Sequence, residues 1–251
     1  MPRKAAKESV ADNAAAPGGA AAVDRALSLL AAYAAGDASL GLAELAERTR
    51  LYKSTVLRLL ASLMHARLIQ QTSDGRYALG TEVARLHSIY AASFSLDQVV
   101  MPVLRDLVAQ TGESAAYHVR QDVRLDGKAD WQRLCLYRVD SPNILRDHVK
   151  AGDILPNDRG AGARVLIAFH EAGYAEMPQK DKKLLANIRA QGYCALVGDR
   201  SSELAGISAP VLKADGSLAA ALTLTMPAHR YDERFVKPVL EAARRLGALV
   251  G

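Results

Sequence analysis

Three consecutive residues with phosphate-binding chemistry begin one of the predicted helices. Lys53, Ser54 and Thr55 supply one cation and two hydroxyl groups, beside backbone N–H groups that the first turn of a helix leaves without an intrahelical partner. Arg58 follows about one turn later, where its guanidinium group can bind O6 and N7 of a guanine together. Ser54 can equally cap the helix. The spacing predicts DNA contacts, with helix capping as the alternative for Ser54.

Positive charge is concentrated around this helix. The chain has 251 residues, 32 Lys and Arg against 27 Asp and Glu, and a net charge of +5. Asp74 is the only acidic residue between positions 48 and 76. The basic residues of the same interval are Arg48, Arg50, Lys53, Arg58, Arg67 and Arg76. A basic helix face is often merely solvated, but this concentration favours a nucleic-acid surface.

The helix that carries Lys53 and Arg58 is the third of three predicted helices. Hydrophobic spacing indicates helices over residues 23–35, 42–49 and 53–66. Two short strands follow, at 68–71 and 76–79, around a turn-forming sequence at 72–75. Helix, short turn, helix and hairpin together predict a winged helix-turn-helix over residues 23–80. Its candidate DNA-binding residues are Arg48, Arg50, Lys53, Ser54, Thr55, Arg58 and Arg76, with Arg76 at the hairpin tip, over a phosphate or in a minor groove.

The remainder of the chain predicts a different architecture. Residues 1–22 are rich in Ala, Gly and Pro and predict a disordered tail. Residues 81–95 hold a connecting helix, predicted over 81–93. Residues 96–251 mix helices at 96–110, 161–171, 181–191 and 232–249 with strands at 114–120, 134–139, 145–149, 193–197, 207–213 and 217–226. Recurring hairpin signals predict an α+β domain with a largely antiparallel sheet. The polar insert at 121–133, which contains Trp131, is expected to be an extended hairpin and is given no role.

The chain resembles IclR-type bacterial transcriptional regulators in segments that occur in the same order. In the first part these are residues 23–30 (VDRALSLL), 42–49 (LAELAERT), 53–60 (KSTVLRLL) and 74–80 (DGRYALG). In the second part they are residues 111–113 (TGE), 161–166 (AGARVL), 192–193 (GY), 207–211 (ISAPV) and 222–227 (LTLTMP). No single motif carries the resemblance, which spans about residues 23–249.

The resemblance implies a regulator that binds double-stranded operator DNA. Such regulators are usually homodimers, or dimers of dimers, that recognise a palindromic operator. Their first helix and connecting helix commonly form the dimer contact. Their C-terminal domain is similar to profilin/GAF-like ligand-binding folds and binds a small metabolite, often a carboxylate or an aromatic degradation product. Effector binding is then expected to change the separation of the two recognition helices, and with it operator affinity.

Two segments of the second half are candidates for the effector site. Gly160, Ala161, Gly162 and Ala163 begin a predicted helix and can present backbone N–H groups to an anion. Thr223 and Thr225 alternate with apolar residues on a predicted strand, so their hydroxyl groups share one face. The structural alternative for residues 160–163 is a loop whose side chains are small for packing. The alternative for Thr223 and Thr225 is a sheet face exposed to solvent.

The effector candidates depart from the family pattern at three positions. Carboxylate-sensing relatives often have an acidic residue where this chain has Leu196 and a cysteine where it has Gly206. Ala163 replaces a glycine that usually precedes a basic residue. The loss of two polar groups predicts a more apolar or aromatic effector that is larger than a two- or three-carbon acid.

Other functional classes have weaker support. A cysteine-dependent enzyme would have to combine Cys194 with His118 or His170, and no spacing connects them. No phosphate loop, metal-ligand spacing or paired carboxylate motif occurs, so neither a cofactor nor a metal is expected. A small-molecule-binding protein-interaction module without operator binding remains the main alternative.

Composition sets the expected location of the protein. Two cysteines, Cys135 and Cys194, are too few for a disulfide scaffold or a thiolate zinc site. No apolar run approaches the roughly 18 residues that a membrane helix needs, and the first 22 residues lack the apolar core of a signal peptide. The sequence therefore predicts a cytoplasmic protein without a membrane partner.

Overall fold

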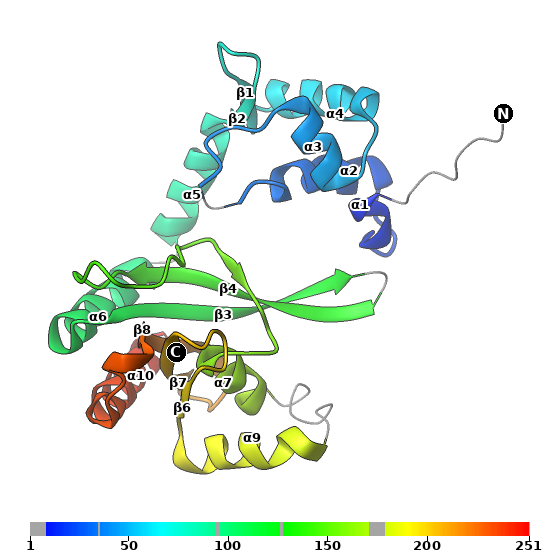
Figure 1. Ribbon diagram of the computed structural model, residues 1–251. Helices are drawn as coiled ribbons and strands as arrows, with labels where there is room; N and C mark the ends of the chain where they lie inside the picture. The colour runs from blue at the N-terminus through cyan, green and yellow to red at the C-terminus, as the bar shows by residue number, and fades with distance from the viewer. Residues whose placement is uncertain (1–8, 35, 94–95, 126–127, 171–178, 251) are drawn as a thin grey trace. The chain divides into compact units, whose positions relative to one another are not determined.

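The computed structural model describes residues 9–34, 36–93, 96–125, 128–170 and 179–250 (Figure 1). The chain divides into two compact units. One comprises residues 1–94 together with 122–130, and the other comprises residues 95–121 together with 131–251. Each unit has its own hydrophobic core.

The N-terminal unit is a helical domain with a short hairpin. Its elements are α1 (Val10–Asn13), α2 (Ala21–Ala31), α3 (Leu42–Thr49), α4 (Lys53–His65), β1 (Ile69–Gln71), β2 (Tyr77–Leu79) and α5 (Thr81–Ser93). The strands β1 and β2 pair antiparallel, with Ile69 opposite Leu79. Residues from α2, α3, α4, both strands and the segment before α3 form the core: Leu29, Leu40, Leu45, Val56, Leu60, Leu63, Ile69 and Tyr77. The winged helix-turn-helix expected from the sequence is confirmed.

The prediction of a disordered tail up to residue 22 is wrong for residues 9–22. Ser9 caps α1 by accepting a hydrogen bond from the Asp12 N–H, and Ala11 is buried. Asp12 also forms an ion pair with Arg25 of α2 at 2.8 Å. An alanine-rich composition concealed a short helix because its stabilising partners lie in the next helix. Helix α2 in turn ends four residues before the predicted position 35.

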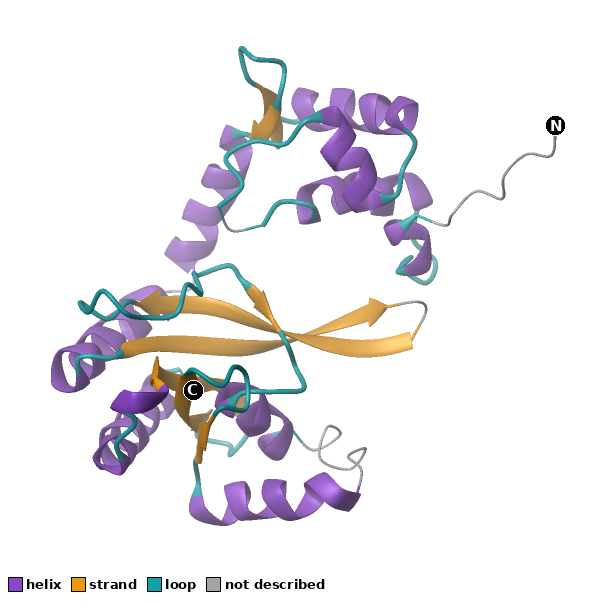
Figure 2. Cartoon of the chain, in the orientation of Figure 1, coloured by secondary structure: helices purple, strands orange, loops and turns teal. Residues whose placement is uncertain are grey.

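The C-terminal unit is built on a six-stranded sheet (Figure 2). Its strands are β3 (Ser114–Leu125), β4 (Lys128–Val139), β5 (Ile154–Leu155), β6 (Cys194–Val197), β7 (Leu204–Leu212) and β8 (Leu218–Pro227). They lie in the order β5-β4-β3-β8-β7-β6. The β3–β8, β4–β5, β6–β7 and β7–β8 pairs are antiparallel, as the sequence predicts.

Helices cover both faces of the sheet, and each face packs with its own helices in a separate core. The helices are α6 (Leu96–Thr111), α7 (Ala161–Phe169), α9 (Gln179–Gln191) and α10 (Val236–Leu249), with short 3-10 turns at Ala228–Arg230 and Glu233–Phe235. Leu222 and Leu224 of β8 pack in one core with α6 and α10. Ala221 of the same strand packs in a second core with α7 and α9. Because side chains alternate along a strand, Thr223 and Thr225 lie on the α7 side.

Two expectations about the strands have different outcomes. The extended hairpin is confirmed, since β3 continues to Leu125 and β4 begins at Lys128. The strand predicted at 145–149 is wrong, because that segment is a loop. Its polar groups are used elsewhere: Leu145 O accepts a hydrogen bond from Arg230, and the Asp147 carboxylate pairs with two arginines. The end of the helix predicted at 161–171 lies outside the described residues, and α7 ends at Phe169.

Candidate functional site

Helix α4 presents a polar face to solvent. Val56, Leu60 and Leu63 are buried in the core of the N-terminal unit. The exposed residues on the other side of the helix are Lys53, Ser54, Arg58, Ala61, Ser62 and His65, while Thr55 is half-buried. The apolar stripe positions Arg58 on the outside because it lies two residues from both Val56 and Leu60. This exposed face corresponds to the face predicted from the sequence.

A three-residue turn connects α3 to α4 and contributes further groups. Arg50 has a left-handed backbone with φ 55° and is exposed. Thr49, just before it, is buried, and its hydroxyl group donates to Leu45 O at 2.6 Å. This hydrogen bond stabilises the last turn of α3. Tyr52 is the residue before α4 and is 70% exposed. Tyr52 was not among the predicted site residues. It could have been noticed because a tyrosine occupies the N-cap position of α4, where its side chain makes no capping hydrogen bond.

Two of the candidate arginines are held by acidic side chains. Arg48 pairs with Asp37 and donates to Ala32 O at 2.8 Å. Arg76 pairs with Glu44 of α3 at 2.8 Å and donates to the side-chain oxygen of Ser39 at 2.9 Å. The Gly41 N–H and Arg76 lower the pKa of Glu44. The Arg76 side chain therefore connects the hairpin to the start of α3, which differs from the predicted position over a phosphate or in a minor groove.

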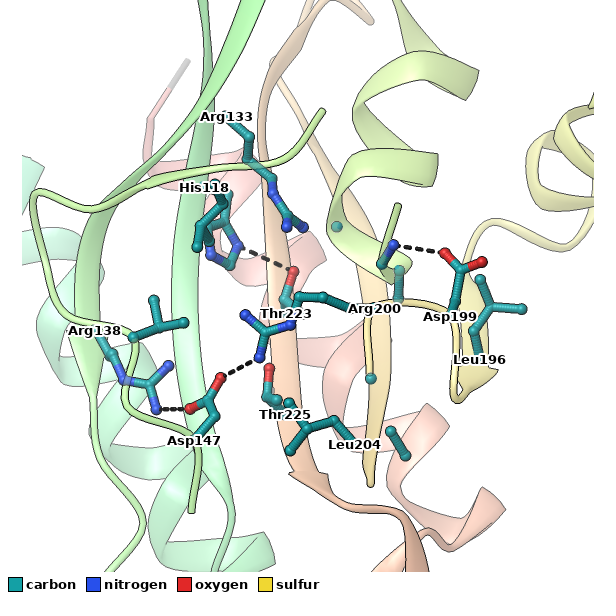
Figure 3. Close-up of a pocket in the computed structure, with 17 residues that line it drawn as sticks. His118, Arg133, Arg138, Asp147, Leu196, Asp199, Arg200, Leu204, Thr223 and Thr225 are labelled. Carbon is teal, nitrogen blue, oxygen red and sulfur yellow. Dashed lines mark hydrogen bonds and ion pairs between the residues drawn. The ribbon is translucent and has the colours of Figure 1, made fainter. Parts of the chain in front are cut away.

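The C-terminal unit holds a small cavity at the N-terminus of α7 (Figure 3). Its volume is about 30 Å³, and one water needs roughly 10–15 Å³ in such a measure. Seven of the predicted effector residues line it: Gly160, Ala161, Gly162, Leu196, Gly206, Thr223 and Thr225. Ala163 does not line it, because its side chain is fully buried in the core side of α7.

Glycines allow the start of α7 to approach the sheet. Gly160 caps the helix with φ 85°, and its N–H donates to the Asp199 carboxylate at 2.5 Å. A Cβ atom on Gly162 would lie 2.8 Å from Oγ1 of Thr223. Only a glycine fits at position 162 without displacing the strand residue. The cavity thus lies against the end of α7 at which the helix dipole is positive.

A buried imidazole and two hydroxyl groups form a hydrogen-bonded chain on the cavity floor. Nδ1 of His118 lies 3.2 Å from Oγ1 of Thr223, and Oγ1 lies 3.0 Å from Oγ of Ser208. Ser208 in turn donates to Leu222 O. Burial, together with the nearby arginines, lowers the pKa of His118 well below 6.5. The ring is therefore neutral at physiological pH.

Three arginines also line the cavity, and none of them is among the predicted effector residues. Asp147 links two, pairing with Arg138 and, at 2.7 Å, with Arg200. The third is Arg133, whose side chain descends from β4 toward the start of α7 in Figure 3. Burial lowers the pKa of Arg133 to about 10. The cavity is thus more polar than Leu196 and Gly206 alone suggested. Its charged lining favours an effector with a charged group over one that is only apolar.

The described residues give little support to metal or thiol chemistry. They contain no cluster of three or more His, Cys, Asp or Glu side chains arranged to hold a metal ion. Burial raises the pKa of Cys135 to about 11 and that of Cys194 to about 12. Both thiols are therefore protonated at neutral pH, whereas the thiolate is the nucleophile. None of the described helices combines the length and apolarity needed to cross a membrane.

Comparison with known proteins identifies relatives of both units. Residues 22–73 match the IclR helix-turn-helix domain, and residues 177–248 match the bacterial transcriptional regulator IclR C-terminal domain. The chain is 25% identical to the transcriptional repressor IclR of Escherichia coli, covering 100% of this chain and 97% of that protein. It is 26% identical to the glycerol operon regulatory protein of Streptomyces coelicolor, covering 75% and 78%.

Solved structures show the same fold. An IclR homolog from Microbacterium hydrocarbonoxydans, crystallised with 4-hydroxybenzoate, matches with a TM-score of 0.79 at 20% identity and covers 91% of this chain and 98% of its own. An ICLR transcriptional regulator from Silicibacter matches with a TM-score of 0.71 at 25% identity, covering 90% and 96%. The domain matches and the full-length relatives together show that this chain belongs to the IclR family of bacterial transcriptional regulators.

Proposed function

We propose that this regulator recognises a specific operator through α4 and that a small molecule bound in the C-terminal cavity controls its DNA affinity. The observation that carries the first part is the exposed face of α4. It combines cations and hydroxyl groups on a helix of 13 residues whose other side is buried. A helix of this kind fits the major groove of B-DNA. In these terms residues 23–80 are the DNA-binding region, 81–95 the connection and 96–251 the effector-binding region.

Each candidate DNA-binding residue receives a role from its position. Arg58 lies one turn into α4 and reads a base edge. Lys53, Ser54 and Thr55 contact phosphate at the helix N-terminus, and Arg50 contacts the backbone from the turn. Arg48 and Arg76 support this surface, since their guanidinium groups are paired with Asp37 and Glu44. Residual DNA contacts by these two are secondary, because each would have to share its charge with a carboxylate.

The oligomer is a homodimer or a dimer of dimers on a palindromic operator. Exposed apolar side chains on two helices of the N-terminal unit support this assignment. Val23 and Leu27 of α2 are 54% and 53% exposed, and Leu86 of α5 is 48% exposed. Large apolar side chains gathered on a surface typically mark protein contacts. Half-sites then lie about 34–36 Å apart per helical turn of DNA.

Effector binding acts through the arrangement of subunits. The relative crystallised with 4-hydroxybenzoate supports a small organic acid as the class of effector. A ligand that favours one separation of the two recognition helices changes operator affinity, and couplings of this kind are typically worth about 1–3 kcal/mol. The protein works in the cytoplasm, where its DNA target lies, and regulates rather than catalyses.

Genome-wide isolation of the bound DNA segments tests the proposal. Recovered segments should share a palindromic sequence, and the purified chain should bind it with an affinity that falls steeply as salt rises. A scrambled palindrome is the control. Failure to enrich any sequence, or binding that ignores both salt and sequence, would favour a protein-interaction module.

A further inference from the structure

We propose that Arg133 selects the effector by its charge, holding the carboxylate group of a monoanionic organic acid against the N-terminus of α7. This inference rests on the proposed effector function of the cavity and names the residue that determines which effectors bind. The argument starts from a buried cation whose polar atoms are not satisfied by the described residues.

Arg133 is 3% exposed, yet Nε and Nη2 have no hydrogen-bond partner among the described residues. Leaving a buried charged donor without a partner is strongly unfavourable, and native proteins rarely do so without a ligand, ion or water. Both atoms belong to a planar fork whose geometry matches the two oxygens of a carboxylate. The side chain therefore has the chemistry of a group that binds a carboxylate through two parallel hydrogen bonds.

The position of the Arg133 guanidinium group at the N-terminus of α7 further favours a bound anion. Nη1 and Nη2 lie 3.5 and 3.6 Å from the place where a Cβ on Gly160 would be, and Nη1 lies 2.9 Å from the corresponding place on Gly162. Arg133 therefore packs on the first turn of α7. A cation at this end of a helix is repelled by the helix dipole. An anion between them would be attracted by both.

Nearby acidic side chains are already engaged. Asp147 pairs with Arg138 and Arg200, Asp199 pairs with Arg164 and the Gly160 N–H, and Asp158 pairs with Arg159. The charged lining residues and their ion-pair partners Arg164 and Asp140 comprise four arginines and three aspartates, so one positive charge is left over. This balance favours a ligand group with a single negative charge.

His118 adds a second orphaned group to the same wall. The residue is 3% exposed, and Nε2 has no hydrogen-bond partner among the described residues. Because Ser208 donates to Leu222 O, Thr223 donates to Ser208, and Nδ1–H of His118 donates to Thr223. In the neutral ring Nε2 is then an acceptor that suits a hydrogen-bond donor on the ligand, whereas the donors of Arg133 and of the first turn of α7 suit the oxygens of a carboxylate. At about 30 Å³ the cavity has room for roughly two waters by this measure, so it suits a small head group.

A comparison of acids with their neutral amides tests the inference on the full-length protein. The probes are formate, acetate, pyruvate, benzoate and 4-hydroxybenzoate, each beside its primary amide, with inorganic phosphate as a further anion. Thermal shift finds the ligands, and calorimetry gives their dissociation constants. The variants are Arg133→Met, which removes the charge at similar length, and Arg133→Lys, which keeps the charge but not the fork. Arg245→Met is the matched control, because Arg245 pairs with Asp106 and does not line the cavity.

We expect at least one acid, and none of the amides, to stabilise the wild-type protein. Arg133→Met should weaken binding of that acid on the order of 100-fold, Arg133→Lys should weaken it less, and Arg245→Met should leave it unchanged. Without ligand, Arg133→Met should unfold at the same temperature as the wild type or higher, because it removes an uncompensated buried charge. A purely structural arginine would give a lower unfolding temperature instead.

Several results would overturn the inference: no stabilisation by any acid, equal binding of acid and amide, preference for phosphate, or undiminished acid binding by Arg133→Met. A DNA-binding assay on the same samples separates the two claims. Specific DNA binding that responds to an amide as well as to its acid would refute carboxylate selection and leave the proposed regulation intact. Acid binding through Arg133 without any specific DNA binding would refute the proposed function alone.

Discussion

Gly162 lies so close to Arg133 that the first side-chain atom of any other residue at position 162 would be 2.9 Å from Nη1 of the arginine. The same atom would be 2.8 Å from Oγ1 of Thr223. The glycine therefore keeps open the space between α7, β4 and β8.

Replacing this glycine should close the effector cavity. We expect Gly162→Ala to destabilise the protein by about 1–3 kcal/mol through overpacking and to abolish stabilisation by any acid that binds the wild type. Urea unfolding and thermal shift measure the two effects. Gly247→Ala is the control, since its Cβ would lie 2.3 Å from Leu212 O and outside the cavity. It should destabilise the chain but keep the ligand response; loss of the response in both variants would contradict the prediction.

Arg58 and Lys53 should differ in what their removal does to DNA binding. Arg58→Ala should weaken operator binding by about 1–3 kcal/mol and leave non-specific binding nearly unchanged, because a base contact is lost. Lys53→Ala should weaken binding to all sequences alike and lower the salt slope by roughly one unit. Fluorescence anisotropy over a salt series, on operator and scrambled DNA, measures both. Equal losses on the two DNAs for Arg58→Ala would make it a phosphate contact.

The Arg76–Glu44 pair should act mainly on the stability of the N-terminal unit. Its side chains are 39% and 46% exposed, so solvent screening keeps the contribution of the pair small. Arg76→Ala and Glu44→Gln should each lower the free energy of unfolding slightly, and the double variant by less than the sum of the two. Arg76→Ala should also weaken DNA binding less than Lys53→Ala. The opposite order, without a change in stability, would place Arg76 on the DNA.

His118 should make the folded state sensitive to acid. Its pKa in the folded state lies well below 6.5 because of burial and the arginines around it, whereas the unfolded chain takes up a proton near pH 6.5. The contribution of His118 is therefore fully present above pH 6.5 and is lost as the pH falls, by up to about 1.4 kcal/mol per unit. Urea unfolding from pH 7.5 to 5 should show a smaller loss for His118→Gln. The exposed His229 provides a control in His229→Gln, which should retain the wild-type slope.

The exposed apolar residues of α2 and α5 should determine the oligomeric state. Leu27→Glu and Leu86→Glu each place a charge in the proposed contact, so either should shift sedimentation toward the monomer and reduce operator affinity. Leu249→Glu is a suitable control, because Leu249 is similarly exposed at 53% but belongs to α10. Unchanged sedimentation in both test variants would exclude these helices from the dimer contact.

The amino-acid sequence determined the N-terminal elements and the exposed face of α4. A buried stripe such as Val56, Leu60 and Leu63 is a local pattern with the helical period, so α4 and the side that carries Arg58 follow directly. The antiparallel sheet and most of the candidate positions that line the cavity also followed, because short motifs around Gly160 and Thr223 carry the family resemblance. The ion pairs of Arg48 with Asp37 and of Arg76 with Glu44 could not be predicted from local sequence, since the partners come from other segments.

Only the tertiary structure decided the character of the cavity. Arg133 and His118 lie on different strands, and the register and order β4-β3-β8 bring them together with Thr223 and the start of α7. Strand alternation indicates which residues share a face, but it does not say which strands are neighbours or which helix covers them. For the same reason the loop at Asp147 was mistaken for a strand: its partners, Arg138 and Arg200, are separated by 62 positions in the chain. Charge balance in a buried site depends on such distant pairings, and these exist only once the chain is folded.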